Sequence, residues 1–109
     1  DAWTNYFSGD DALVETGSLT YPGITAAGNS MSFDGSGADP VVDYTPTNAG
    51  KIYASFMLQV TALDAAAADG YFAVLRTDSG SYESRLWITP TGATTYRVGI
   101  SNGGTLWHR

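Results

Sequence analysis

The segment that decides the fold is Lys51–Thr61, whose sequence is KIYASFMLQVT. Along it, every second residue from Ile52 to Val60 is apolar, and these residues fall on one side. A period of two is the pattern of a β-strand with one face on a core and the other toward solvent. The segment is eleven residues long, well above the usual strand length of about five or six. It therefore predicts a long inner strand of a β-sandwich, with Phe56 buried near its centre.

Further strand signals lie on both sides of this segment, separated by turns rich in Gly, Pro and Asn. No segment longer than a turn or two has helical periodicity. This spacing predicts an all-β fold, an antiparallel two-sheet jelly-roll sandwich. The other predicted strands are Ser18–Tyr21, Ser30–Phe33, Val41–Tyr44, Tyr71–Arg76, Ser84–Thr89, Thr95–Ser101 and Thr105–His108, with an N-terminal strand around Trp3, Tyr6 and Phe7.

The length of 109 residues leaves room for one domain, residues 1–109. The sequence stops at Arg109, where a last strand begins or runs. Eight strands in so short a chain leave one sheet of a sandwich thinly covered. We therefore expect residues 1–109 to be the N-terminal two thirds of a larger domain; the alternative is a small but complete sandwich.

Composition excludes several classes of function. Eleven acidic against five basic residues give a net charge of −6, which argues against nucleic acid and against an anionic membrane surface. The absence of cysteine excludes disulfides and thiolate metal sites. No apolar run reaches the roughly 20 residues that a membrane helix needs, so no membrane insertion is expected.

An ordered series of short motifs resembles a known family. These motifs are LTYPG at 19–23, GNS at 28–30, KIYASF at 51–56, GYF at 70–72 and RLW at 85–87. Across roughly residues 17–103 the chain resembles the concanavalin A-like lectin/glucanase (laminin-G-like) jelly-roll module of secreted Bacteroidetes proteins.

The resemblance implies export from the cell, commonly through the type IX system, and a place in a large secreted or cell-surface protein. It carries over no catalytic residue. We therefore expect a noncatalytic extracellular module with a structural or adhesive role, whose partners are glycans or other cell-surface proteins. The alternative function is a carbohydrate-binding module.

Catalytic patterns are missing from the sequence. A glycan hydrolase needs a pair of carboxylates across the scissile bond, but the two glutamates, Glu15 and Glu83, lie in no such motif. The single histidine, His108, lies next to the end of the sequence, and no nucleophile elbow is present. We therefore expect no enzymatic activity.

Carbohydrate binding would need an exposed aromatic platform with polar partners. The candidates are Trp87, Tyr82 and Arg85, because Trp87 alternates with the apolar Leu86 and Ile88. In this interpretation the Trp87 ring faces solvent. The alternative is that Trp87 packs in the second sheet layer, or on residues missing from this chain.

Calcium is the one metal ion that the sequence suggests. The loop from Asp34 to Asp39 offers Asp34, Ser36 and Asp39 as oxygen ligands, and Asp43 could complete the shell. The alternative is a turn in which the aspartates bond their own backbone. A second acidic loop, with Asp64 and Asp69, is a weaker candidate.

Overall fold

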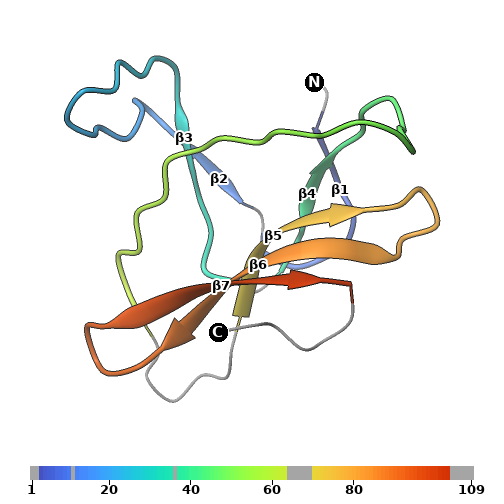
Figure 1. The fold of residues 1–109 in the computed structure, drawn as a ribbon. Coiled ribbons are helices and arrows are strands. Elements are labelled where there is room, and N and C mark those ends of the chain that lie inside the picture. Colours follow the sequence, from blue (N-terminus) through green and yellow to red (C-terminus); the bar gives the residue numbers. More distant parts are fainter. Residues whose placement is uncertain (1–2, 11, 36, 64–69, 104–109) are drawn as a thin grey trace. The chain divides into compact units, whose positions relative to one another are not determined.

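A computed structural model describes residues 3–10, 12–35, 37–63 and 70–103 of the chain. Within these ranges the protein is all-β: it has strands in small antiparallel sheets and no helix (Figure 1). The chain divides into two compact units, residues 1–59 and 60–109. The coarse prediction of an antiparallel β-protein is therefore confirmed. The predicted single domain and jelly roll stay predictions.

The first unit contains two pairs of short strands. β1 (Trp3–Asn5) pairs with β4 (Pro40–Val42), and β2 (Leu13–Glu15) pairs with β3 (Ser30–Ser32), both antiparallel. The β1–β4 ladder continues by one bond, from the Tyr6 amide to the Asp39 carbonyl (3.0 Å). The strand at Ser30 is confirmed. The N-terminal strand is confirmed at Trp3, but Tyr6 and Phe7 lie outside it, and the predicted Val41–Tyr44 strand is shorter.

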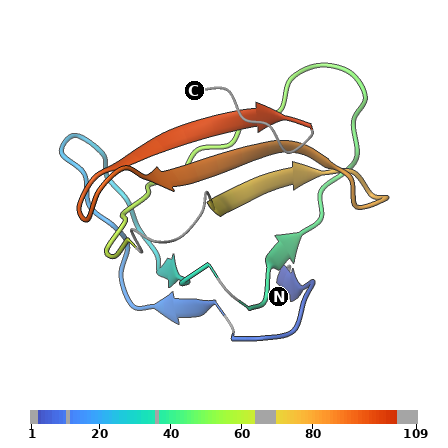
Figure 2. The ribbon, with the colours of Figure 1, turned by 90° about the horizontal axis from the view of Figure 1, so that it is seen from below.

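The second unit contains the main sheet, a three-stranded meander (Figure 2). Its strands are β5 (Gly70–Arg76), β6 (Tyr82–Pro90) and β7 (Tyr96–Asn102), with β6 in the middle. Tight turns join them, closed by bonds from the Thr77 amide to Ser81 and from the Thr91 amide to Thr95. All three strands match their predicted positions within two residues. The strand predicted at Thr105–His108 lies outside the described residues.

The prediction of a long strand at Lys51–Thr61 is wrong. These residues form no strand, and their apolar side chains are largely exposed: Ile52 is 46%, Phe56 55% and Leu58 39% exposed. A stable strand needs both an amphipathic side-chain pattern and a partner strand, and alternation in the sequence shows only the pattern. The partner strand supplies the backbone that completes the hydrogen-bonded ladder, and no sheet of the described residues includes this segment. The predicted strand Ser18–Tyr21 is also absent; Tyr21 makes only an isolated bridge with Ile24.

Candidate functional site

The candidate site lies on one face of the β5–β6–β7 sheet. Residues directly opposite each other in an antiparallel ladder lie on the same face. Trp87 of β6 is opposite Tyr71 on one side and Gly99 on the other, and Arg85 is opposite Ser101. This arrangement gathers aromatic, cationic and hydroxyl groups on one surface. We call Tyr71, Tyr82, Arg85, Trp87 and Ser101 the Arg85 cluster.

Trp87 is the buried centre of this cluster, with 7% of its surface exposed. Its indole N–H donates a hydrogen bond of 3.0 Å to the hydroxyl of Ser101, which is 2% exposed. Gly99 has no side chain, so it leaves room above β7 for the indole to reach Ser101. Because Trp87 is buried, the interpretation of its ring as a solvent-facing platform is wrong. Its packing in the second layer of a sandwich stays a prediction.

The two tyrosines surround Trp87 and Arg85 with aromatic rings. The Tyr71 ring meets the Trp87 ring edge-on, with centroids 5.6 Å apart, and lies 5.7 Å from the Tyr82 ring. The two phenol oxygens are 3.4 Å apart, within hydrogen-bonding distance. Such aromatic contacts add to the stability gained from burial. Tyr71 and Tyr82 are both half-buried, so part of each ring remains open to solvent.

Arg85 is held among these rings. The central carbon of its guanidinium lies 4.5 Å from the Tyr82 ring centroid, 5.5 Å from that of Trp87 and 5.6 Å from that of Tyr71. At these distances the faces of the rings attract the cation. The structure therefore brings together all three residues proposed from the sequence, Trp87, Tyr82 and Arg85. Sequence reasoning missed Tyr71 and Ser101, which come from the neighbouring strands.

The proposed calcium ligands do not come together in the same way. Among the described residues, no three His, Cys, Asp or Glu side chains form a group that could hold a metal ion. Asp34, Asp39 and Asp43 therefore do not form such a group, and Ser36 lies outside the described residues. Asp64 and Asp69 also lie outside them.

Glu15, one of the two glutamates, has a structural contact. Its carboxylate accepts a hydrogen bond of 2.9 Å from the Ser32 hydroxyl, which links β2 to β3. Glu83 is exposed, and its backbone carbonyl accepts the Gly103 amide at the end of the β6–β7 ladder. His108 lies outside the described residues.

The first unit has an open hollow of about 490 Å³. Its lining contains no charged side chain and consists of Leu19, Thr20, Tyr21, Ile24, Phe56, Met57, Leu58 and Gln59. Aliphatic and aromatic side chains without a charged partner supply neither an acid, a base nor a metal ligand. The hollow is therefore lined by apolar and uncharged polar side chains.

Comparisons with known proteins identify no relative. No protein-family model, no curated protein and no solved structure matches the chain significantly. A search of the described residues for a helix long and apolar enough to cross a membrane also finds none.

Proposed function

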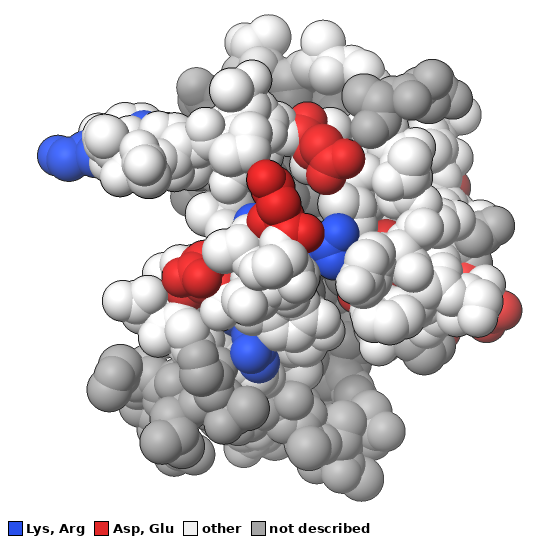
Figure 3. Space-filling model, turned by 90° about the vertical axis from the view of Figure 1, so that its right-hand side faces the viewer, with Lys and Arg blue, Asp and Glu red and all other residues white. Residues whose placement is uncertain are grey.

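We propose that this chain is a noncatalytic β-sandwich module of the concanavalin A-like, laminin-G-like jelly-roll type. Its role is structural or adhesive, within a larger secreted or cell-surface protein. Supporting this proposal are the antiparallel meander with tight turns and a surface that carries few charges, since only 15% of the residues are charged (Figure 3). Modules of this composition rely on uncharged polar and apolar surfaces for their contacts.

The observation that carries the proposal is the exposure of apolar side chains. Among the described residues, the only hydrophobic side chains that count as buried are those of Ala38 and Trp87, whereas nineteen large ones are exposed. Contiguous exposed apolar surface marks an interaction site on a soluble protein. A module with such surfaces serves to pack against another protein layer, which is what a structural or adhesive role requires.

One of these surfaces is the face of β7 opposite Trp87. Tyr96, Val98 and Ile100 alternate along this strand on the face opposite Trp87, and they are 40%, 57% and 58% exposed. Backbone bonds at the two ends of the β6–β7 ladder show its register: the Thr95 carbonyl accepts from the Thr91 amide, and the Gly103 amide donates to the Glu83 carbonyl. Because bonding alternates along an antiparallel strand, the backbone groups of these three apolar residues point away from β6. Among the described residues β7 is an edge strand. It therefore presents apolar side chains beside backbone groups that no described strand pairs, as an adhesive strand would.

A pair of substitutions tests this role. Threonine keeps the β-branched shape that suits strands, so Val98→Thr with Ile100→Thr removes apolar surface from β7 while preserving its strand propensity. We expect the unsubstituted protein to self-associate in sedimentation velocity experiments and to bind a hydrophobic dye, and the double variant to do both less. Arg97→Thr, on the opposite face of the same strand, is the matched control and should change neither. A dye-inert monomer at high concentration would contradict the adhesive role.

The Arg85 cluster favours carbohydrate binding as a second candidate function. Partly open tyrosine rings can stack on the apolar face of a pyranose, and a guanidinium between them can bond its hydroxyls. In this arrangement Tyr82 and Tyr71 would contact the sugar, while the buried Trp87 would support them from below. Tyr82→Ala should then reduce retention on a polysaccharide affinity gel. Tyr53→Ala, which removes an aromatic ring that is 84% exposed and outside the cluster, should leave retention unchanged.

A further inference from the structure

Arg85 has an unusual set of partners for a guanidinium. Arginine carries five N–H donors and no acceptor, yet Arg85 donates no hydrogen bond to any described residue, and no described carboxylate lies within ion-pair distance of it. This holds in a chain whose eleven acidic residues outnumber its five basic ones. The partners it does have are the three aromatic rings, which attract its charge but accept its N–H groups only weakly.

One nitrogen of Arg85 is sealed from water without an acceptor. Its Nε is buried and has no hydrogen-bond partner, and the same is true of Oγ1 of Thr89, which lies on the same face of β6 beyond Trp87. Buried polar atoms of this kind are rare in folded proteins, and each calls for an explanation, such as strain, a water molecule, an ion or a functional role. The two terminal nitrogens of Arg85 are not among the buried unpartnered atoms. Arg85 as a whole is half-buried, so part of its side chain is open to a ligand.

The chemical complement of this arrangement is a planar or tetrahedral oxyanion. A carboxylate or sulfate group can accept two parallel N–H bonds from a guanidinium, and such charge-assisted bonds are about twice as strong as neutral ones. We propose that Arg85 binds the carboxylate or sulfate group of an acidic saccharide. This inference rests on the second candidate function, carbohydrate binding, and names its substrate class.

The surroundings of Arg85 favour a short acidic saccharide over other anions. The flanking Tyr71 and Tyr82 rings suit the apolar face of a sugar, which an acidic peptide or a free anion lacks. Residues 60–109 contain four acidic and four basic side chains, whereas residues 1–59 contain seven acidic and one basic. The Arg85 cluster thus belongs to the neutral half of the chain, which does not repel a single acidic group. A long polyanion would be repelled by the net charge of −6 of the whole chain.

The test uses matched pairs of sugars that differ only in the acidic group. Galacturonate against its methyl ester examines the carboxylate, and lactose sulfate against lactose examines the sulfate. Calorimetric titration of the full chain should give at least about tenfold tighter binding for one acidic form than for its neutral counterpart, because one charge-assisted bidentate contact separates them. The pair that shows the difference identifies the oxyanion.

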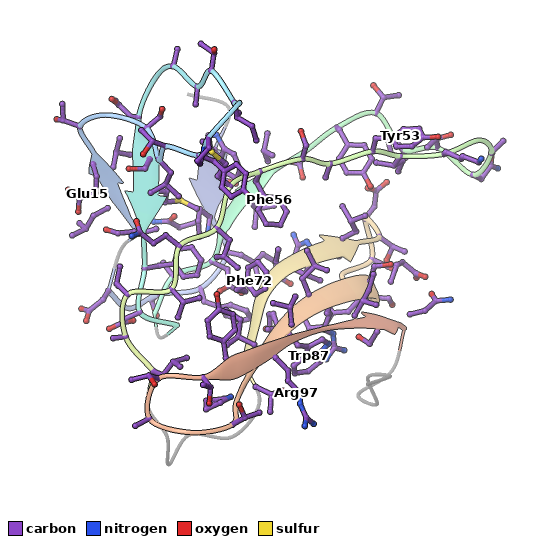
Figure 4. All side chains as sticks on the ribbon, turned by 60° about the vertical axis from the view of Figure 1, so that its left-hand side comes forward. Glu15, Tyr53, Phe56, Phe72, Trp87 and Arg97 are labelled. Atoms are coloured by element: carbon purple, nitrogen blue, oxygen red, sulfur yellow. The ribbon has the colours of Figure 1, made fainter. Side chains whose placement is uncertain are left out.

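Two variants assign the effect to Arg85. Arg85→Gln should remove the preference for the acidic sugar, and Arg85→Lys should retain part of it, since lysine keeps the charge but not the two-pronged geometry. Arg97→Gln is the control: this arginine lies on the same face but is exposed, and its side chain extends away from the ribbon in Figure 4. It should bind as the unsubstituted protein does.

A measurement on the unsubstituted protein tests the inference without relying on variants that could misfold. The Nε–H resonance of Arg85 should shift on titration with the preferred acidic sugar and not with its neutral form. Equal binding of both forms, unaffected by Arg85→Gln, would overturn this inference and leave carbohydrate binding intact. Binding of neither form would overturn both. Equal competition by a glutamate peptide would overturn the saccharide as ligand.

Discussion

The two units of this chain build β-structure in different ways. In residues 60–109, three strands of seven to nine residues are joined by tight turns into one antiparallel sheet. In residues 1–59, the strands are three residues long, and the pairs join segments far apart in the sequence, such as Trp3 with Val42. The strands are long where pairing is local and short where it is not.

Loop closure explains this difference. Bringing two segments together costs entropy that grows with the length of the loop between them, and only the contacts formed afterwards offset it. The turns at Thr77–Ser81 and Thr91–Thr95 close over five residues each, so each hairpin strand finds its partner at little cost. In the first unit, backbone hydrogen bonds also connect loops, for example from the Ala38 amide to the Asp10 carbonyl (3.0 Å).

The largest expected effect comes from the centre of the second unit. Trp87→Ala should lower the free energy of unfolding by about 3–5 kcal/mol, because it removes a buried ring and leaves a cavity. Urea unfolding followed by circular dichroism measures this loss. Tyr53→Ala is the matched control, since Tyr53 is 84% exposed and its removal should change stability by at most about 0.5 kcal/mol. A cost below about 1 kcal/mol for Trp87→Ala would show that side-chain packing does not hold the second unit together.

The first unit should instead be sensitive to a backbone change. Gly37 has a positive φ of 92°, and a Cβ there would lie 2.6 Å from the Asp10 amide nitrogen, with the Asp10 carbonyl also too close. Gly37→Ala should therefore cost about 2–5 kcal/mol, from the left-handed backbone and from the overlap together.

Gly50→Ala separates these two costs. Gly50 has a similar φ of 86° but open space around it, so it should lose only the backbone part, about 1–2 kcal/mol. Equal losses for the two variants in the same urea experiment would show that the loops at Asp10 and Gly37 do not hold each other in place.

The same contrast decides what could be predicted from the sequence. Counting from the Thr91–Thr95 turn pairs Arg85 with Ser101. Counting from the Thr77–Ser81 turn pairs Tyr71 with Trp87, because the two register shifts between them cancel. The three strands were predictable because their partners are neighbours in the sequence, and the same counting would have found both missed members of the Arg85 cluster. Non-local pairings leave no such signal. β2 was missed because Leu13–Glu15 is too short to show alternation.

Burial was harder to predict than strand position. On β6 and β7 the apolar residues Leu86, Ile88, Val98 and Ile100 alternate with other residues, a pattern typical of an inward face. Yet the two β7 residues are exposed and Trp87 is buried. Alternation identifies two faces of a strand but not which of them another layer will cover. A large aromatic ring with one polar atom can be buried if that atom finds a partner, and Ser101 supplies it.

The hydroxyl of Ser101 should therefore contribute more to the free energy of unfolding than its small size suggests. Ser101→Ala leaves the buried indole N–H of Trp87 without an acceptor, which should cost about 1–3 kcal/mol. Repeating the substitution in a Trp87→Phe background tests the cause, because phenylalanine has no N–H to leave unpaired. The cost of Ser101→Ala should then fall substantially. An unchanged cost would mean that the hydroxyl acts through some contact other than the indole.

The smallest expected effect returns to Lys51–Thr61, where pattern and structure disagree. Figure 4 shows Tyr53 and Phe56 on a stretch of chain outside any strand, and Phe56 is 55% exposed. Phe56→Ala should therefore cost less than about 1 kcal/mol, far below the loss expected for a buried aromatic ring. The comparison with Trp87→Ala, in the same buffer and by the same urea titration, isolates burial as the variable. A loss of about 3–5 kcal/mol at Phe56 would mean that Lys51–Thr61 is an inner strand in solution. Its eleven-residue alternation would then have found a partner strand, as local propensity and global fold are expected to agree in a natural sequence.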